Sequence, residues 1–524
     1  MKYRILCTDG FAKSGLARLE ADSNLEVEFC ASLSHEELID KIEGFDGLIV
    51  RSSSKVSRDV IERGKGLKVI ARAGVGTDNI DIDAATERGI MVVNAPAGNT
   101  TSTAELTFSM ILALARHIPQ AARLMAEGKW EKKRFKGSEI AHKKLGIIGM
   151  GRIGYEVAKR ALAFDMIVLG FDPYLSDEKF ESLGVKKAGL EEICRQADYI
   201  TIHTPLTKET ENLIAAKEIG MMKQEACIVN CARGGIVNER DLANALKEGR
   251  ITGAALDVFT KEPFDDTIFQ GLDNCILTPH LGASTAEAQD AVAVEAAAAV
   301  SQYFSEGISP NAVNLAGADG ISWQKFKNHI SLSEKLGSLV SQLAGGGISK
   351  ITLICQSGLP RLITLAAIKG AFEHLSDGQV TFVNAEAIAR GRGVAIAGEV
   401  TGIKPDFAEA FGIKITTSKG EFEAWGAVLP DGTTKITNCG EYRVEIDPEG
   451  AILFIHNVDR PGVIGGVCTV LGSQGINIAE MQNVRKSQGT EALTIIGVDK
   501  TVDAKSLEKI AEVDGVTDVK LVRL

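Results

Sequence analysis

The sequence lacks the features that mark several large classes of protein. Its 58 Lys and Arg residues are outnumbered by 69 Asp and Glu residues, which gives a net charge of −11. Nucleic-acid binding needs a positive face that neutralises phosphates, so this balance argues against a nucleic-acid partner. A local basic pocket for a small anionic substrate is still compatible with it.

Long hydrophobic runs are also missing. The first residues, MKYRILCTDGF, predict a strand and a glycine-containing turn rather than the apolar segment of a signal peptide. The most apolar helical stretch, AVAVEAAAAV at residues 291–300, is too short to span a bilayer. We expect no membrane partner.

Cysteines are few and scattered, nine in 524 residues, and none forms a C-x-x-C pair. This pattern predicts neither a disulfide framework nor a cysteine-based metal site, and no metal is expected. It is typical of a reduced, cytoplasmic protein.

The order of elements predicts an α/β fold. Short β-branched runs alternate with amphipathic stretches over the first 310 residues, which favours parallel sheets with helices on both faces. The cycle starts afresh at KLGIIGMG, residues 144–151. Two connecting helices are expected to begin with capping boxes, Ser102 with Glu105 and Ser284 with Glu287. The second unit then becomes an insertion in the first, with a cleft between them.

The remaining chain predicts two further units. Residues 318–446 read as a mixed α/β segment with hairpin signals and no recognisable catalytic cluster. Residues 450–524 follow the order strand, helix, strand, strand, helix, strand, which is a βαββαβ ferredoxin-like unit. Pro461 is expected as the first residue of its first helix, and Gly475 as the stop.

A glycine-rich turn carries the first chemical signal. Gly149, Gly151 and Gly154 form G-x-G-x-x-G after an apolar strand and before a helix, and the next strand ends at Asp172. This context predicts dinucleotide binding, with the pyrophosphate at a helix N-terminus. Asp172 should accept hydrogen bonds from the ribose and repel a 2′-phosphate, so we predict NAD over NADP. The bland alternative is a glycine-rich turn with a solvated aspartate.

Three residues follow, each at the end of a predicted strand: Arg233, Glu262 and His280. Because ligands sit at the carboxyl ends of strands in open α/β sheets, these side chains should converge. A histidine that takes a hydroxyl proton, a carboxylate that orients it and an arginine that holds a carboxylate suit oxidation of a 2-hydroxy acid. Singly, each could be an ion pair, a cap or a core histidine.

The ordered set GMGRIG, Asp172, NCARGG, DVFTKEP and TPHLGAST resembles the D-isomer-specific 2-hydroxyacid dehydrogenase family. Within that family, RSSSKV, RAGVGTDNID, NAPAGNTTSTAEL and EGKWEKKRFKGSEI are similar to members that oxidise 3-phosphoglycerate. The resemblance extends over essentially the whole chain. It implies a Rossmann-type NAD-binding domain at 97–282, inserted in a flavodoxin-like substrate-binding domain at 1–96 and 283–313. An intervening domain at 318–446 and an ACT regulatory domain at 450–524 follow.

The resemblance implies NAD-dependent oxidation of 3-phospho-D-glycerate to 3-phosphohydroxypyruvate, the first step of L-serine biosynthesis. It assigns catalytic roles to Arg233, Glu262 and His280. Beside the fingerprint glycines it places NAD contacts at Val75, Arg152, Ile153, Asp172, Thr204, Cys231, Ala232, Arg233, Asp257, His280, Leu281, Gly282 and Ala283.

A phosphorylated acid needs cations in the first domain. Arg51, Arg72 and the basic group around Lys132 are the candidates, although a charge run such as the last is as often a solvated surface. Lys132 stands where the family commonly has an arginine, which keeps the charge but loses the fork. Ser52, Gly76 and Asn99 should bond the substrate from loops.

The tail resembles the ACT pattern and implies L-serine as effector, with Asp459 and Asn477 at the serine-binding positions. Alternatively, Asp459 merely caps the helix after it. The family implies a homotetramer. Two other functions stay open: another D-2-hydroxyacid dehydrogenase, acting on glycerate, lactate or 2-hydroxyglutarate, and an NAD-sensing scaffold protein.

Overall fold

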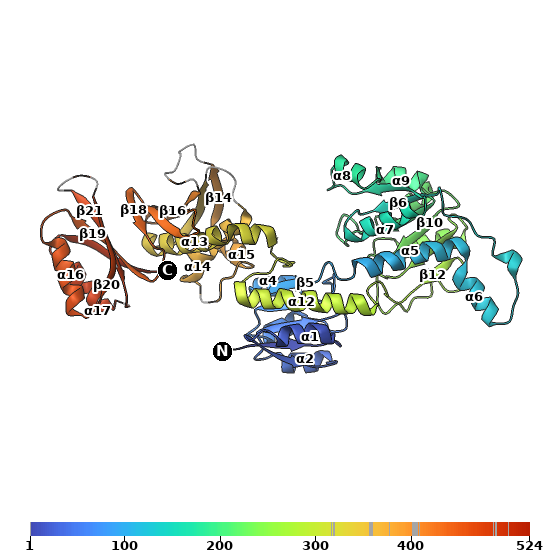
Figure 1. Cartoon of the computed structure of the whole chain (residues 1–524), viewed down its shortest axis with the longest axis horizontal. Coiled ribbons are helices and arrows are strands. Elements are labelled where there is room, and N and C mark those ends of the chain that lie inside the picture. The colour runs from blue at the N-terminus through green and yellow to red at the C-terminus, as the bar shows by residue number, and fades with distance from the viewer. Residues whose placement is uncertain are drawn as a thin grey trace.

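Four sheets, each with its own helices, succeed one another along an elongated molecule in this computed structural model (Figure 1). The structure describes residues 2–315, 317, 320–355, 360–376, 378–400, 407, 409–485, 487, 490–500 and 502–524. The sheets fall within the four predicted domains, whose boundaries remain predictions. The predicted boundary at residue 318 lies outside the described residues.

The first sheet is parallel, with the strand order β2-β1-β3-β4-β5 expected of a flavodoxin-like unit. Its side chains pack alternately into two hydrophobic cores, one on each face of the sheet, because successive residues of a strand point to opposite faces. Ile5 and Ile49 pack toward α12, whereas Leu6 and Leu48 pack on the other face. The strands are β1 (Tyr3–Cys7), β2 (Leu25–Phe29), β3 (Gly47–Val50), β4 (Val69–Arg72) and β5 (Met91–Asn94), and the helices are α1 (Lys13–Glu20), α2 (His35–Lys41), α3 (Arg58–Arg63), α4 (Ile82–Glu87) and α12 (Ala286–Glu306).

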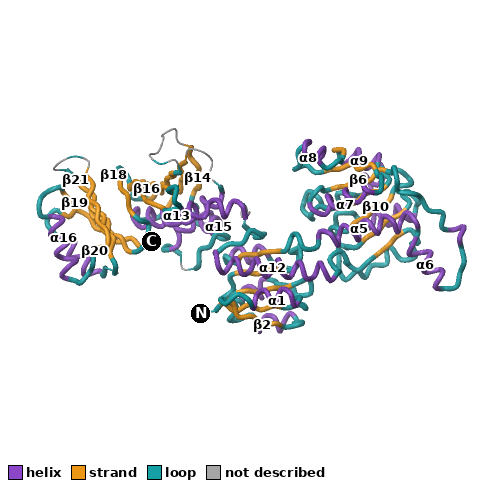
Figure 2. Tube along the Cα trace, in the orientation of Figure 1, coloured by secondary structure: helices purple, strands orange, loops and turns teal. Residues whose placement is uncertain are grey.

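The second sheet, also parallel, runs β12-β11-β10-β9-β6-β7-β8. The strand order reverses between β6 and β9, the switch point where doubly wound sheets bind ligands. Figure 2 shows its strands flanked by helices. The strands are β6 (Lys144–Ile148), β7 (Ile167–Phe171), β8 (Lys186–Lys187), β9 (Tyr199–Ile202), β10 (Cys227–Asn230), β11 (Gly253–Leu256) and β12 (Cys275–Leu277). The helices are α5 (Thr100–Arg116), α6 (Ile118–Ala126), η1 (Lys132–Arg134), α7 (Arg152–Ala163), α8 (Asp177–Ser182), α9 (Leu190–Gln196), α10 (Ala216–Met221) and α11 (Glu239–Lys247).

The two connecting helices begin differently from the prediction. Helix α5 starts at Thr100, and the Ser102 hydroxyl donates to the carbonyl oxygens of Asn99 at 3.1 Å and Gly282 at 2.9 Å. Helix α12 is capped by Thr285, whose Oγ1 accepts from the Ala288 amide at 3.1 Å. Both predicted capping boxes are therefore wrong. Ser102 bonds to the segment that leads into α12, and Thr285 caps α12 in place of Ser284.

The third unit has a mixed sheet, β14-β13-β15-β16-β17-β18, with helices packed against it. Its elements are α13 (Gly320–Ala344), β13 (Ile348–Cys355), α14 (Arg361–Glu373), α15 (Ala385–Gly391), β14 (Ala395–Val400), β15 (Ala410–Thr417), β16 (Gly420–Val428), β17 (Thr434–Cys439) and β18 (Tyr442–Ile446).

The fourth unit confirms the predicted βαββαβ order, with the sheet β20-β21-β19-β22. One sheet face packs on helices, and the other joins a core shared with the third unit through Phe454 and Leu493. The prediction for Pro461 is wrong, since the helix begins at Val463 after Gly462, whose φ is 94°. The elements are β19 (Ala451–Val458), α16 (Val463–Ser473), β20 (Ile478–Arg485), β21 (Glu491–Val498), α17 (Ala504–Ala511) and β22 (Val516–Arg523). No described helix combines the length and apolar character that a bilayer crossing requires.

Candidate active site

A cleft of about 670 Å³ lies between the first two units, where the loops after β3 and β4 face the loops after β9, β10 and β11. Because the second unit is inserted in the first, as expected from the sequence, the carboxyl ends of the strands of the two sheets lie opposite each other. Most of the predicted site residues line the cleft: Arg51, Ser52, Arg72, Val75, Gly76, Asn99, Ile153, Thr204, Cys231, Ala232, Arg233, Asp257, Glu262, His280, Gly282 and Ala283.

The predicted base and its carboxylate are in direct contact. His280 Nδ1 lies 2.7 Å from Glu262 Oε2, and the other oxygen of Glu262 accepts from the Phe259 amide at 3.0 Å. Burial by itself raises the pKa of Glu262, but the bonds from His280 and Phe259 outweigh it and hold that pKa below its ordinary value. The carboxylate thus stays ionised at neutral pH, and fixes a proton on Nδ1 that leaves Nε2 as the acceptor.

The His280 loop is held by a buried aspartate. Asp257 accepts from the Leu281 amide at 2.7 Å, the Gly282 amide at 2.9 Å and the Thr278 hydroxyl at 2.6 Å. Asp257 was predicted to contact NAD. That contact stays a prediction; the carboxylate secures the backbone on both sides of His280, which itself has a φ of 54°.

Arg233 reaches across the cleft to the first unit. Its Nε donates to Asp78 Oδ2 at 3.1 Å, and its Nη1 donates to the carbonyl oxygen of Ala232 at 2.7 Å. Gly76 makes room for it, since a Cβ there would lie 2.0 Å from Arg233 Nη2. Asp78 was not predicted, because its partner comes from a segment 155 residues away.

Two more arginines give the cleft an anion-binding character. Arg51 and Arg72 line it together with Arg233. Burial lowers the pKa of Arg72 to about 10, and the charges of Arg233 and Arg51 add to that effect. Among the described residues, neither Arg72 Nε nor Asn99 Oδ1 has a hydrogen-bond partner. Buried groups of this kind are normally satisfied, so the Arg72 donor fits an anionic oxygen and the Asn99 acceptor fits a hydroxyl donor of a ligand.

The predicted substrate contact Lys132 is not brought to this cleft. It lies exposed in η1, where the neighbouring Arg134 pairs with Asp273 at 2.6 Å. Within one chain this basic group has the character of a solvated surface, and Lys132 does not line the cleft.

The β6–α7 turn fits a dinucleotide. Gly149 has a φ of 91°, and a Cβ on Gly154 would lie 2.1 Å from the Gly149 carbonyl oxygen. Nothing lies within 4 Å of the position a Gly151 Cβ would take, so a pyrophosphate has room there. Arg152 and Ile153 begin the helix whose N-terminus faces that space.

Asp172 lies beside the β6–α7 turn, and its predicted contact with the ribose stays a prediction. Its carboxylate accepts from the Met150 amide at 3.0 Å and the Tyr174 amide at 2.9 Å. Two carboxylate oxygens have about four acceptor positions, so capacity is left for hydroxyl donors. Nearby, Thr204 Oγ1 and His203 Nδ1 have no partner among the described residues. His203, which was not predicted, is buried with its pKa lowered to about 3, so it is neutral.

The two predicted serine-binding residues lie apart. Asp459 follows β19 and pairs with Arg485 at 2.8 Å, whereas Asn477 precedes β20 and donates to Asp499 at 2.6 Å. Strand pairing aligns Ala451 with Val498 at one end of the sheet and Val458 with Glu491 at the other. Asp459 and Asn477 lie just beyond these two ends, so at roughly 3.4 Å a residue they are about 30 Å apart along the sheet.

Comparison with known proteins agrees with this geometry. Residues 108–282 match the family model for the D-isomer specific 2-hydroxyacid dehydrogenase, NAD binding domain. Residues 325–439 match the D-3-phosphoglycerate dehydrogenase intervening domain, and residues 451–515 match the ACT domain. Among solved structures, a D-lactate dehydrogenase from Aquifex aeolicus, complexed with NAD and lactic acid, is 28% identical with a TM-score of 0.52. The match covers 58% of this chain and 96% of that one.

The chain therefore belongs to the D-isomer specific 2-hydroxyacid dehydrogenases. The curated relatives narrow the family further. The D-3-phosphoglycerate dehydrogenase of Methanocaldococcus jannaschii is 43% identical over 99% of this chain and 100% of its own length. That of Bacillus subtilis is 38% identical over the full length of both chains. Within the larger family, this chain is a member of the D-3-phosphoglycerate dehydrogenases.

Proposed function

We propose that this protein oxidises 3-phospho-D-glycerate to 3-phosphohydroxypyruvate with NAD, the first step of L-serine biosynthesis. The observation that carries the proposal is the hydrogen-bonded pair of His280 and Glu262 in a cleft that holds three arginines. The full-length likeness to D-3-phosphoglycerate dehydrogenases supports it.

The chemistry follows from the orientation of these groups. His280 takes the hydroxyl proton of the substrate on Nε2, and Glu262 stabilises the imidazolium that results. Arg233 pairs with the substrate carboxylate, and its Asp78 contact keeps its side chain across the cleft. When bound, NAD supplies the acceptor for the hydride that leaves the same carbon.

The arginines favour a phosphorylated acid over glycerate or lactate. A single carboxylate is matched by Arg233 alone, whereas Arg51 and Arg72 are further cations for a phosphate. The test compares kcat/KM for 3-phosphoglycerate and D-glycerate. We expect a loss of about 10²-fold or more without the phosphate, because charge-assisted bonds go unmade. Equal values for the two acids would instead favour another 2-hydroxyacid, and absence of turnover would favour the scaffold function.

We also propose that L-serine binds the ACT domain through Asp459 and Asn477. The domain match supports an amino-acid effector. Because the two residues stand at opposite ends of one sheet, a site that contains both needs Asp459 from one chain and Asn477 from another.

A homotetramer is the assembly we propose. Two separate exposed apolar surfaces support it: one at Met125 and Trp130 around α6, the other at Ile396 and Val400 on the edge strand β14. Two interfaces of different kinds generate a tetramer from pairs of dimers. Light scattering at several protein concentrations measures the assembly. The cytoplasmic location stays a prediction from the nine cysteines, all free thiols.

A further inference from the structure

The loop after β3 presents Arg51 and Ser52 to the cleft without any regular structure of its own. Two side chains outside the predicted site hold it in place. We propose that Asp9 and Asn79 are positioning residues, which fix residues 51–54 so that Arg51 and Ser52 meet the anionic end of the substrate. This inference rests on the proposed function for the identity of that substrate.

Asp9 holds the amide side of the loop. Its Oδ2 accepts from the amides of Arg51 and Ser54, each at 2.9 Å, and its Oδ1 accepts from the Ser54 hydroxyl at 2.7 Å. Asp9 follows β1 and has a φ of 61°, a left-handed conformation that is uncommon outside glycine. The backbone adopts it at the point where the carboxylate reaches both amides.

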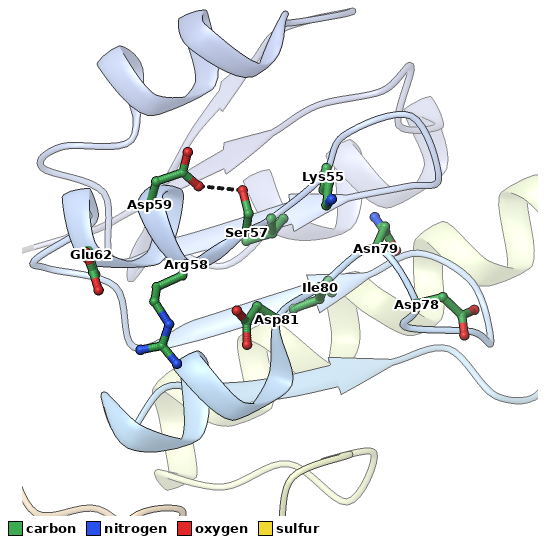
Figure 3. A pocket seen from close by; sticks show the side chains of 10 residues that line it. Lys55, Ser57, Arg58, Asp59, Glu62, Asp78, Asn79, Ile80 and Asp81 are labelled. Carbon is green, nitrogen blue, oxygen red and sulfur yellow. Dashed lines mark hydrogen bonds between the residues drawn. The ribbon is translucent and has the colours of Figure 1, made fainter. Parts of the chain in front are cut away.

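Asn79 holds the carbonyl side. Its Nδ2 donates to the carbonyl oxygens of Arg51 and Ser54, each at 2.7 Å. In Figure 3 its amide points toward the loop that leads into Lys55, whereas Asp78 points away from it. The amide and the carbonyl of both residues are thus satisfied by two side chains from different loops. Arg51 Nη1 also donates to the Asp9 carbonyl oxygen at 3.5 Å, which leaves the other guanidinium donors of Arg51 and the side chain of Ser52 for the cleft.

We call the contacts of Asp9 and Asn79 with residues 51–54 the clamp. The arginine charges in the cleft are the reason why the loop needs it. Arg51, Arg72 and Arg233 lie close enough for their charges to lower the pKa of Arg72. Repulsion by Arg72 and Arg233 opposes the position of Arg51 in the cleft, and the charges of Asp78 and Asp9 offset part of it. Fixing the loop in advance removes the ordering cost from the binding step, which is the physical basis of preorganisation.

The hollow of about 580 Å³ drawn in Figure 3 does not account for Asn79. Two of its charged side chains are engaged locally: Arg58 pairs with Glu87 at 2.7 Å, and Asp59 with His35 at 2.9 Å. The Asn79 side-chain amide donates to residues 51 and 54 of the loop. We therefore assign its role to the cleft on the other side of that loop.

The test uses pairs of variants of the full chain, assayed for turnover of 3-phosphoglycerate and NAD. Asp9→Asn keeps an acceptor for the two amides and Asp9→Ala removes it. We expect Asp9→Ala to raise KM for 3-phosphoglycerate about tenfold or more, and Asp9→Asn to stay within about threefold of wild type. KM for NAD should change in neither variant. Asn79→Asp turns carboxylate oxygens toward two carbonyl oxygens. It should therefore raise KM for 3-phosphoglycerate at least as much as Asn79→Ala does.

Asp46→Ala is the matched control. Asp46 also accepts from a backbone amide in this unit, that of Arg4 at 2.9 Å, but it precedes β3 at the opposite end of the sheet. It should lower the melting temperature without changing either KM. If Asp9→Asn is as impaired as Asp9→Ala, charge rather than hydrogen bonding is responsible and the clamp is refuted.

Residue-resolved hydrogen exchange separates this inference from the proposed function. The amides of Arg51 and Ser54 should exchange faster in Asp9→Ala than in wild type, with no substrate present. Unchanged exchange at both amides overturns the clamp even if the enzyme turns over. A wild type that does not oxidise 3-phosphoglycerate overturns the proposed function, while the exchange result still decides the clamp.

Discussion

His280 draws its chemical character from one neighbour. Its Nδ1 is committed to Glu262 at 2.7 Å, which leaves Nε2 for the substrate. Taken alone, a histidine between Pro279 and Gly282 is an ordinary loop residue. The carboxylate beside it, 18 residues earlier in the chain, changes that interpretation.

Glu262 should make stability depend on pH in a defined direction. Its pKa is lowered in the folded state, so its contribution is complete above its ordinary value of 4.5 and is lost as pH falls through the folded value. We expect the difference in free energy of unfolding between wild type and Glu262→Gln to shrink as the pH falls below about 5. Denaturant unfolding at a series of pH values measures this. A difference that grows on acidification would contradict the assignment.

Asp172 should decide between the two nicotinamide cofactors. Asp172→Ala should narrow the preference for NAD over NADP, because it removes the charge that repels a 2′-phosphate. Asp172→Asn is the matched comparison, since it can still accept from the Met150 amide and hold the turn. The ratio of kcat/KM values for NAD and NADP is the measurement. An unchanged ratio in both variants would show that Asp172 does not face the ribose.

At the scale of elements, two glycines of the turn from β6 to α7 have different roles: Gly154 is needed for folding and Gly151 for cofactor binding. Gly154→Ala forces a Cβ to 2.1 Å from the Gly149 carbonyl, so it should cost about 1–3 kcal/mol of stability. Gly151→Ala meets nothing within 4 Å, so its melting temperature should hold while NAD binding weakens about tenfold or more. Calorimetric titration with NADH and thermal melting measure the two effects. Normal NADH binding by Gly151→Ala would exclude the turn as the pyrophosphate site.

The elements that the sequence predicted well are those with strong local patterns. Short apolar runs predicted β1 to β5 and the strands from β6 to β12 except β8, a two-residue strand too short to show a period. The cap of α5 was predicted wrongly, because Ser102 bonds to Gly282, 180 residues away, and no local pattern contains that contact. The cap of α12 was predicted one residue too early, since Thr285 and not Ser284 accepts from the helix amide. Asp9, Asn79 and Asp78 were missed for the same reason: their partners come from other strands' loops.

At the scale of the whole molecule, the separation of Asp459 from Asn477 makes serine binding a property of paired chains. Asp459→Ala and Asn477→Ala should each abolish L-serine binding. Chains of the two variants mixed in equal amounts and reassembled should regain about a quarter of the sites, because about half of the two-fold pairs are mixed and in each mixed pair one site combines both substitutions while the other has neither. Calorimetric titration of the mixture measures this. Binding by either single variant, or none by the mixture, would contradict a shared site.

The central claim is that the cleft between the first two units oxidises 3-phosphoglycerate with His280 as the base. One measurement tests it most directly. NADH production from 3-phosphoglycerate and NAD at alkaline pH is compared for wild type and His280→Gln. Loss of a positioned general base typically costs about 10²–10⁴-fold, so the account predicts robust wild-type turnover that falls by that factor. Turnover that survives in His280→Gln, or a wild type that binds NAD but leaves 3-phosphoglycerate unchanged, would contradict it.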